Sequence, residues 1–329
     1  MNRVTKTIGA ALAIMLLLCS LVLLIALKRW DRTFVAPMPN LRSVSDTGII
    51  ARGRYLAYGP AHCADCHAPP EFKSKVDSDQ EVPMSGGYEI KTYLGEIRPP
   101  NITPDSVTGM GRITDGELAR FFRYGVDHRG QVGLPIMMLA DLSDKDLVAI
   151  ISFLRSTTPV KHEVAASHYN LLGKMTRAFF LEPFAPKIIP PPSQTPAISI
   201  QYGDYLVNTV SNCASCHTER NMKTGDYTGP RLAGGMVFRS SGSQHESLIS
   251  PNLTPDSATG RITKWSQEIF IQRFKMGNLG NTENIRSWSP MPWGPFSRMT
   301  DQDLGAIYLY LMQLPPVHKE NVLPKENPL

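Results

Sequence analysis

The longest apolar stretch of the sequence lies near its beginning, over residues 8–27. This stretch, IGAALAIMLLLCSLVLLIAL, contains no charged side chain. At about 1.5 Å of rise per residue, a helix of this length spans the roughly 30 Å hydrocarbon core of a bilayer. A cleaved signal peptide has a shorter apolar region, of about 7 to 15 residues, and a small-residue cleavage site, which is missing before Lys28. The pattern therefore predicts an uncleaved membrane anchor over residues 1–30.

Beyond the apolar stretch, hydrophobic residues recur at the three- and four-residue spacing of amphipathic helices. Residues 114–125 and 264–277 show this spacing, and both segments end in glycine, at Gly125 and Gly277. Glycine commonly follows the last turn of a helix because it adopts a left-handed backbone conformation without strain. The pattern of apolar positions therefore predicts an all-α fold.

One further helix is expected near the end of each half of the chain. Ser143 and Thr300 are hydroxyl residues suited to cap a helix, and acidic residues follow each of them within the first turn. The residues just before these caps, Leu142 and Met299, are apolar. We expect them to act as hydrophobic staples at the helix starts.

The two halves of the sequence are duplicates of one another. Three segments recur in the same order. The first, GRYLAYGPAHC from Gly53, returns as GDYLVNTVSNC from Gly203, and the second, PNITPDSVTGMGRITDGELARFFRYG at 100–125, returns as PNLTPDSATGRITKWSQEIFIQRFKMG at 251–277. The third, LSDKDLVAIISFL at 142–154, returns as MTDQDLGAIYLYL at 299–311. A repeat of this length indicates two whole domains rather than a solenoid.

The duplication divides the chain into domains at residues 47–156 and 198–318, separated by a linker over residues 157–197. The Pro-rich end of the linker, residues 183–196, is expected to be extended and semi-rigid. Its segment YNLLGKMTRAFFL is expected to form a short amphipathic helix. Such a helix should pack against a neighbouring domain, because its apolar residues would otherwise stay exposed.

The charge distribution argues against a nucleic-acid-binding protein. The net charge is +5 and the calculated isoelectric point is about 8.9, which is only mildly basic. Lysine, arginine, aspartate and glutamate are interspersed, and no basic run of five or more residues occurs. The sequence therefore lacks the basic patch that binds phosphate backbones.

The chain has five cysteines, and four of them lie in two copies of C-x-x-C-H, within AHCADCH and SNCASCH. This is the attachment sequence of c-type haem, in which two thiols bond the porphyrin and the histidine binds the iron. On a helical turn these positions share one face, so both sulfurs and the imidazole meet one flat macrocycle. The motifs predict two covalently bound haem c groups, attached by Cys63, Cys66, His67, Cys213, Cys216 and His217.

Two other readings of the cysteine pairs stay open at this point. The four cysteines together suit a structural zinc site, and each pair alone suits a redox-active disulfide. Neither of these sites requires a histidine directly after the second cysteine, and the sequence has that histidine both times.

The repeated motifs resemble those of the di-haem and tri-haem cytochrome c subunits of bacterial membrane-bound dehydrogenases, such as alcohol and gluconate dehydrogenases. The resemblance covers residues 47–318 and rests on G-x-Y-L before the haem motif, P-N-[IL]-T-P-D, and [ST]-D-x-D-L-x-A-I. It implies two tandem cytochrome c-like domains. The chain has two haem motifs where the alcohol dehydrogenase subunits have three.

The resemblance implies that His67 and His217 are the proximal iron ligands. Each would bind iron through one ring nitrogen and donate a hydrogen bond from the other, which fixes the tautomer and the ring plane. In small c-type cytochromes, a proline carbonyl in a Gly-rich loop often accepts that bond. The loops EVPMSGG and GPRLAGG offer Pro83 and Pro230 for this role.

The same resemblance implies methionine as the sixth ligand, in the loop before the last helix, because a thioether favours reduced iron. The loops offer Met291 in the second half and two adjacent residues, Met137 and Met138, in the first. We expect Met137 and Met291 to bind iron. The remaining histidines are expected to be surface or structural residues: His62, His128, His162, His168, His245 and His318.

The resemblance also implies a function. Haem of this type is attached outside the cytoplasmic membrane, so we expect a single-pass protein of the bacterial inner membrane whose haem domains face the periplasm. It would carry electrons from a periplasmic dehydrogenase to an oxidase or a small cytochrome of a respiratory chain. We expect an electron-transfer protein or dehydrogenase subunit rather than a stand-alone enzyme. Di-haem peroxidases and thiosulfate dehydrogenases are the enzymatic alternatives, and a zinc-stabilised membrane protein is a third.

Overall fold

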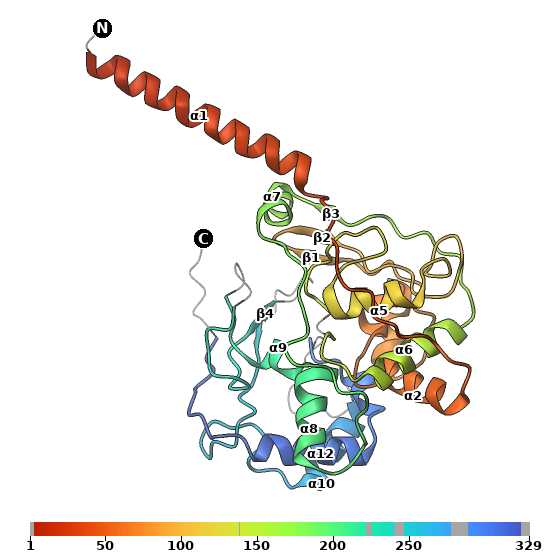
Figure 1. Ribbon diagram of the computed structural model, residues 1–329. Coiled ribbons are helices and arrows are strands. Elements are labelled where there is room, and N and C mark those ends of the chain that lie inside the picture. Colours follow the sequence, from red (N-terminus) through yellow and green to blue (C-terminus); the bar gives the residue numbers. More distant parts are fainter. Residues whose placement is uncertain (1–2, 138, 222–225, 240–246, 278–288, 324–329) are drawn as a thin grey trace.

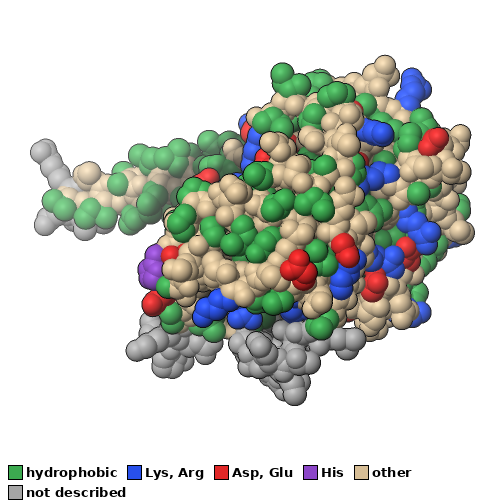
Figure 2. All heavy atoms as spheres, turned by 90° about the horizontal axis from the view of Figure 1, so that it is seen from below, with side chains coloured by type: hydrophobic (Ala, Val, Ile, Leu, Met, Phe, Trp, Pro, Cys, Tyr) green, Lys and Arg blue, Asp and Glu red, His purple; other side chains and the backbone are tan. Residues whose placement is uncertain are grey.

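A computed structural model describes residues 3–137, 139–221, 226–239, 247–277 and 289–323 of the chain (Figure 1). The first helix, α1 (Arg3–Arg29), projects from a body that contains all the other elements. Its segment Thr7–Arg29 contains an 18-residue window with a mean hydropathy of 3.0, and hydrophobic side chains cover the projecting helix (Figure 2). The segment is long and apolar enough to cross a membrane, and signal sequences share these properties.

The body contains corresponding elements in its two halves. The first half comprises α2 (Thr47–Tyr58), α3 (Ala64–His67), the 3₁₀ turn η1 (Pro70–Phe72), α4 (Lys73–Asp77), β1 (Ile90–Thr92), β2 (Gly95–Ile97), α5 (Asp115–Tyr124) and α6 (Asp144–Ser156). The connecting segment carries β3 (His168–Tyr169) and α7 (Leu171–Phe179). The second half comprises α8 (Ile200–Tyr205), the π-helical turn η2 (Leu206–Val210), α9 (Cys213–His217), β4 (Val237–Arg239), β5 (Ser247–Ile249), α10 (Gln267–Lys275), α11 (Trp293–Ser297) and α12 (Asp301–Met312).

Local capping signals set the ends of several helices where the sequence predicts them. Helix α5 begins with a capping box between Thr114 and Glu117 and ends at Gly125, whose φ is +70°. The hydroxyls of Ser143 and Thr300 cap α6 and α12, each accepting a hydrogen bond of 3.1 Å from a backbone N–H in the first turn. Helix α10 begins only at Gln267, so the predicted start at residue 264 was too early.

The expectation of an all-α fold was wrong in one respect, because short strands accompany the helices. Strands β1, β2 and β3 form an antiparallel sheet in that order, with Ile90 opposite Ile97. Strands β4 and β5 pair antiparallel, with Val237 opposite Ile249. Each strand is only two or three residues long, too short for an alternating pattern to emerge from the sequence. The structure is therefore helix-rich but not all-α.

Glycine explains how the paired helices of each half approach so closely. Helix α2 packs against α6, and α8 packs against α12. A Cβ at Gly53 would overlap the carbonyl of Ala149, and a Cβ at Gly203 would overlap that of Ala306. The G-x-Y-L motif and the alanine of D-L-x-A-I are thus the two sides of one helix crossing, formed once in each half.

The two halves contact each other through a reciprocal pair of hydrogen bonds. The hydroxyl of Tyr55 in α2 donates to Asp303 in α12 at 2.7 Å, and the hydroxyl of Tyr205 in α8 donates to Asp146 in α6 at 2.8 Å. The Tyr55 hydroxyl also accepts a hydrogen bond from the backbone N–H of Thr300, which caps α12, at 3.1 Å. The Tyr205 hydroxyl accepts one from the backbone N–H of Ser143, which caps α6, also at 3.1 Å. Equivalent motif residues therefore build both sides of the interface.

Arg52 and Tyr202 lie at the centre of this interface. Arg52 forms an ion pair with Asp146 at 2.9 Å and donates to the Tyr202 hydroxyl at 3.2 Å. Nearby, the ring of His62 packs edge-on against Phe296 of the other half, with ring centroids 5.6 Å apart. Buried apolar residues of both halves form one continuous core cluster. The halves are therefore packed against each other rather than merely connected.

The connecting segment follows the surface of the first half. Its Pro-rich end, residues 183–196, contains neither helix nor strand, as expected for an extended segment. The carbonyls of Pro191 and Pro192 accept hydrogen bonds from the first turn of α6, at 3.0 and 3.1 Å. These bonds satisfy backbone N–H groups that have no partner within the helix.

Candidate haem centres

Each C-x-x-C-H motif folds into a single helical turn, α3 or α9. In the first motif, the N–H of His67 donates to the carbonyl of Cys63 at 2.9 Å, which brings the histidine onto the same face as the cysteine. No disulfide joins the four motif cysteines, all of which lie in the described part of the chain. Their exposure increases along each motif: Cys63 is buried and Cys66 half-buried, while Cys213 is half-buried and Cys216 exposed. The second thiol of each pair thus lies nearer the surface.

The histidine rings of both motifs are buried and held in the same way. Nδ1 of His67 lies 2.9 Å from the carbonyl oxygen of Pro100, and Nδ1 of His217 lies 3.1 Å from that of Pro251. A carbonyl only accepts, so Nδ1 carries the proton and Nε2 is left as the ring's lone-pair donor. Burial lowers the pKa of both rings, partly offset by this hydrogen bond. Each imidazole is therefore neutral and oriented as a metal ligand requires.

The predicted acceptors, Pro83 and Pro230, were wrong. The acceptors are Pro100 and Pro251, which begin the repeated P-N-[IL]-T-P-D segment. The sequence already held a signal, because this segment follows the motif histidine by 33 residues in one half and 34 in the other. The Gly-rich loops that contain Pro83 and Pro230 have a different role.

The Gly-rich loops bind the backbone of the motif histidines. The N–H of Gly86 donates to the carbonyl of His67, and the N–H of Gly234 donates to that of His217, both at 2.7 Å. These glycines have φ values of +78° and +74°. A Cβ at either position would overlap the proline loop that accepts the imidazole bond. Glycine is thus required both for the backbone conformation and for the close packing of the two loops.

Two asparagines that the sequence analysis did not single out order the proline loops. Asn252 is 1% exposed; its side chain donates to the carbonyl of Val317 at 2.8 Å and accepts from the backbone N–H of Thr254 at 2.9 Å. Asn101 makes the equivalent bonds in the first half, where its acceptor is the carbonyl of Val160. Each asparagine ties the loop to the segment that follows the last helix.

Replacement of Asn252 by alanine is expected to lower the free energy of unfolding by about 1–3 kcal/mol, because it leaves buried polar partners unsatisfied. It should also shift the reduction potential of the second centre by loosening the loop that orients His217. Chemical denaturation and redox titration measure these effects. The matched change, Asn101→Ala, should move the first potential instead. An equal effect of either variant on both potentials would contradict this assignment.

The candidate methionine ligands lie on the core of their respective halves. Met137 and Met291 are half-buried and pack against the core cluster. The backbone around Met291 is held by a hydrogen bond from its N–H to the Ser289 hydroxyl at 3.2 Å, and its carbonyl accepts from the N–H of Trp293 at 2.8 Å. The competing Met138 lies outside the described residues.

The remaining histidines have surface or structural contacts where they are described. His162 bonds the carbonyl of Ser85 through Nδ1 at 2.8 Å, and His318 lies 3.3 Å from the Asp256 carboxylate. His62 packs between the halves, whereas His128 and His168 are exposed. His245 lies outside the described residues.

The surroundings of the thiols argue against the two other hypotheses, a four-cysteine zinc site and redox-active disulfides. Among the residues that the structure describes, no three histidine, cysteine, aspartate or glutamate side chains converge as a metal site would require. Burial raises the pKa of Cys63 to about 12, of Cys66 to about 11 and of Cys213 to about 12. Reactive disulfide-forming cysteines have lowered pKa values instead. A neutral, oriented imidazole beside two thiols fits haem attachment better than zinc or thiol redox chemistry.

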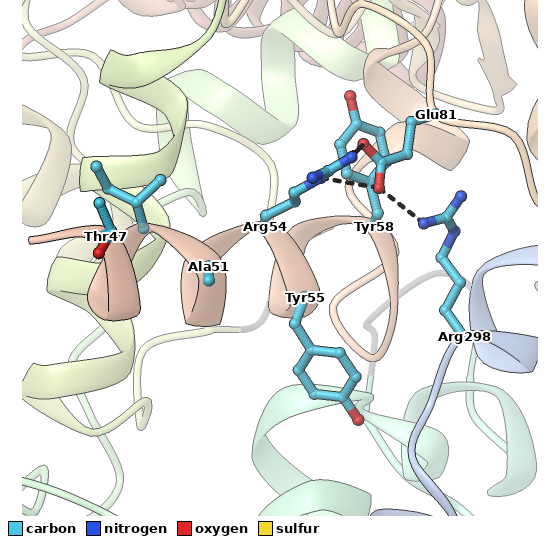
Figure 3. A pocket seen from close by; sticks show the side chains of 8 residues that line it. Thr47, Ala51, Arg54, Tyr55, Tyr58, Glu81 and Arg298 are labelled. Carbon is cyan, nitrogen blue, oxygen red and sulfur yellow. Dashed lines mark hydrogen bonds and ion pairs between the residues drawn. The ribbon is translucent and has the colours of Figure 1, made fainter.

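A cavity of about 540 Å³ lies at the seam between the halves (Figure 3). The side chains of Arg54 and Arg298 converge on the Glu81 carboxylate from opposite sides, each at 2.8 Å. Tyr58 lies beside them, and its hydroxyl donates to the carbonyl of Val82 at 2.7 Å. The cavity has no motif cysteine or histidine in its lining. Its ion pairs join α2 to the second half.

Residues 200–315 match the family model for cytochrome c. The matched residues contain the second C-x-x-C-H motif, so this half of the chain is similar to cytochrome c domains, a class that binds haem c covalently through this motif. Over most of its length the chain is similar to the cytochrome c subunits of alcohol and gluconate dehydrogenases.

Three relatives define this resemblance. The cytochrome c subunit of alcohol dehydrogenase (quinone) from Gluconobacter oxydans is 29% identical over 83% of this chain and 56% of its own length. The cytochrome c subunit of gluconate 2-dehydrogenase from Pantoea cypripedii is 26% identical over 82% of this chain and 60% of its own. A diheme cytochrome c-type protein from Cereibacter sphaeroides is 25% identical over 82% of this chain and 88% of its own. The chain thus spans little more than half the length of the alcohol dehydrogenase subunits it matches.

Proposed function

We propose that this protein is a membrane-anchored di-haem cytochrome c that carries electrons from a periplasmic dehydrogenase to a respiratory acceptor. One observation carries the proposal. Both C-x-x-C-H turns present a buried histidine whose Nδ1 is bound to a proline carbonyl and whose backbone carbonyl is bound to a glycine N–H. The same arrangement, built from duplicated segments, supports one haem in each half, with domains over residues 47–156 and 198–318.

The residues of the chain would hold, orient and shield the two cofactors. Cys63 and Cys66 would attach one haem and Cys213 and Cys216 the other, while the motif histidines provide Nε2 to the iron. When bound, the haem supplies reversible one-electron chemistry, and the protein sets its potential through ligation, hydrogen bonding and burial. The proline carbonyls, by accepting from Nδ1–H, increase the basicity of the imidazoles.

For the sixth ligands we propose Met137 in the first half and Met291 in the second. Met137 lies in the loop before α6, Met291 lies just before the short helix α11 that precedes α12, and both pack on the core. Two six-coordinate irons suit a carrier, whereas a di-haem peroxidase needs one iron with an open or displaceable position.

Similarity and composition support the proposed partner and location. The relatives include subunits named for alcohol, gluconate and fructose dehydrogenases, which favours a dehydrogenase as the electron donor. Helix α1 has the length and hydropathy of a membrane span, which supports a single-pass anchor over residues 1–30. We place the haem domains on the periplasmic side because haem of this type is attached outside the cytoplasmic membrane. The oxidase or small cytochrome that accepts the electrons completes the proposed path.

The experiment that tests this function replaces each methionine by leucine, which nearly preserves the side-chain volume. Met137→Leu and Met291→Leu should each remove the absorption band of iron–sulfur bonding from one centre and lower one of two one-electron potentials, because a thioether stabilises reduced iron. Visible spectroscopy and redox titration read these changes.

The buried Met299 provides a matched control, because Met299→Leu changes a core methionine just before α12 and should keep both bands. A band lost with Met138→Leu but not with Met137→Leu would reassign the first ligand. If Met291→Leu left both potentials unchanged, paired methionine ligation would be refuted and an enzyme with an open iron would be favoured.

A further inference from the structure

Helix α7 has its apolar and polar faces reversed relative to an ordinary surface helix. Its most buried side chains include the cationic Arg177, which is only 6% exposed. Its large apolar side chains point to the outside: Leu171 is 52% exposed, Leu172 53%, Phe179 36%, and Phe180, just after the helix, 78%. Such a helix normally buries its apolar stripe, so the exposed face calls for an apolar environment outside the protein.

The buried arginine attaches α7 to the end of α1. Nε of Arg177 donates to the carbonyl of Trp30 at 3.0 Å, and Nη1 donates to the carbonyl of Val132 at 2.9 Å and to the hydroxyl of Tyr169 at 3.2 Å. The guanidinium also lies 4.5 Å from the centre of the Tyr169 ring. With these donors used, α7 is held to the body by its polar side, and its apolar side is left free.

The position of α7 shows where this apolar face lies relative to α1. In Figure 1, α7 is seen nearly end-on at the foot of α1, whereas α1 runs across the picture, so the two axes cross. Ala26, in the last turn of α1, is fully buried, and α1 contacts α7. Just beyond it, Lys28 and Arg29 are exposed, and Trp30 follows. Aromatic and basic residues of this kind mark the level at which a membrane helix leaves the bilayer.

A second link joins the segment after α1 to the segment that follows the C-terminal end of α7. Arg32 donates to the carbonyl of Leu181 at 2.9 Å and pairs with the carboxylate of Glu182 at 2.6 Å. The segment after α1 and the segment after α7 are thus joined. The end of α1 and the whole of α7 therefore form one unit, whose outer surface combines the apolar span with the apolar face of α7.

We propose that α7 lies on the membrane surface, with the exposed leucine and phenylalanine side chains in the boundary between headgroups and acyl chains. The occupant of the apolar face is the lipid bilayer itself, because α7 contacts the apolar helix α1 and is bonded to Trp30 at its end. This inference rests on the proposed anchoring by α1. It adds a second contact that fixes the tilt of the haem-bearing body above the membrane, which a single flexible anchor would leave undefined.

The test uses the full-length protein with both haems, reconstituted in vesicles of phosphatidylethanolamine and phosphatidylglycerol. A nitroxide label is attached to Leu172→Cys or Phe180→Cys in a Cys19→Ser background. The matched control is Ile269→Cys on α10, an exposed apolar position at the end of the molecule farthest from α1 (Figure 1). Vesicle binding should make the labels at 172 and 180 inaccessible to a water-soluble nickel complex while oxygen still reaches them. The label at 269 should stay accessible to nickel.

The outcomes distinguish membrane contact by α7 from membrane anchoring by α1. Flotation with the vesicles after a high-salt wash reports α1, because apolar burial is insensitive to charge screening. A protein that floats while nickel still reaches positions 172 and 180 would overturn the α7 proposal and leave the anchor intact. Shielding that develops only after a dehydrogenase is added would assign the face to a protein partner and equally overturn the proposal. A protein that does not float would refute both the anchor and the α7 contact.

A second measurement requires no substitution. A photoactivatable phospholipid in the same vesicles should cross-link to the unmodified chain within residues 171–180 and not within residues 267–275. Mass spectrometry of the digested protein locates the modified peptides. Equal labelling of the two segments would contradict a bound α7.

Discussion

Replacement of Cys213 and Cys216 by alanine should yield a chain that retains one covalently bound haem instead of two. Thioether bonds survive denaturation, and the first motif lies on a separate helical turn, α3, with its own proline acceptor and glycine loop. Mass spectrometry of the denatured protein should therefore show a loss of one haem mass, accompanied by loss of half the haem absorbance. The reciprocal variant, Cys63→Ala with Cys66→Ala, should lose the other haem.

The chain offers its own control for this experiment. Cys19 lies in α1, outside either motif, so Cys19→Ala should keep both haems. An unmodified wild-type chain from a host with the haem-attachment machinery would refute covalent haem binding. A wild-type chain with a single haem would restrict the cofactor to the half that matches the cytochrome c family, residues 200–315.

Replacement of Asp146 by alanine should lower the free energy of unfolding by about 3–5 kcal/mol, because it leaves a paired, largely buried charge without its partner. The Asp146 side chain is 4% exposed and that of Arg52 is 20% exposed. The same carboxylate also accepts a hydrogen bond from the hydroxyl of Tyr205, which belongs to the other half. Denaturant unfolding of the haem-loaded protein measures the change.

An exposed aspartate in the second half serves as the comparison. Asp301 has a side chain that is 75% exposed and lies 3.3 Å from the Lys275 ammonium. Asp301→Ala should cost no more than about 1 kcal/mol, as is usual for a surface ion pair. A loss of no more than about 1 kcal/mol from Asp146→Ala would contradict the expected role of this buried carboxylate.

The same interface should be sensitive to alkali. Burial, followed by the neighbouring carboxylates, raises the pKa of Tyr55 and Tyr205 above its ordinary value. Both hydroxyls therefore stay protonated as donors in the folded state. Their contribution to stability is fully present below about pH 10, the ordinary pKa of tyrosine, and declines as the pH rises toward the raised values of the folded state.

Local sequence signals predicted local structure well. The predicted caps at Ser143 and Thr300 and the predicted stop at Gly125 act within one helical turn, so a short window of sequence contains both partners. The haem motif is likewise local, because its thiols and imidazole lie within one turn.

Contacts between distant residues were harder to predict. The carbonyl that binds the ring of His67 is 33 residues away, and any proline carbonyl in a nearby loop satisfies the same chemical requirement. The amphipathic pattern of YNLLGKMTRAFFL predicted a short helix packed against a neighbouring domain; the helix is present over Leu171–Phe179, but its apolar face does not lie in the protein interior. Arg177 faces the protein interior instead, because carbonyl groups distant in the sequence, those of Trp30 and Val132, accept its hydrogen bonds.

The reciprocal tyrosine–aspartate bonds have a consequence for how the chain assembles. Equivalent residues contact one another across the interface in both directions, which is the arrangement of an isologous dimer. Here both partners belong to one polypeptide, so their association is intramolecular and independent of protein concentration. Dilution that would dissociate a pair of single-haem subunits leaves this pair together. The spacing of the two C-x-x-C-H turns is thereby a fixed property of the chain.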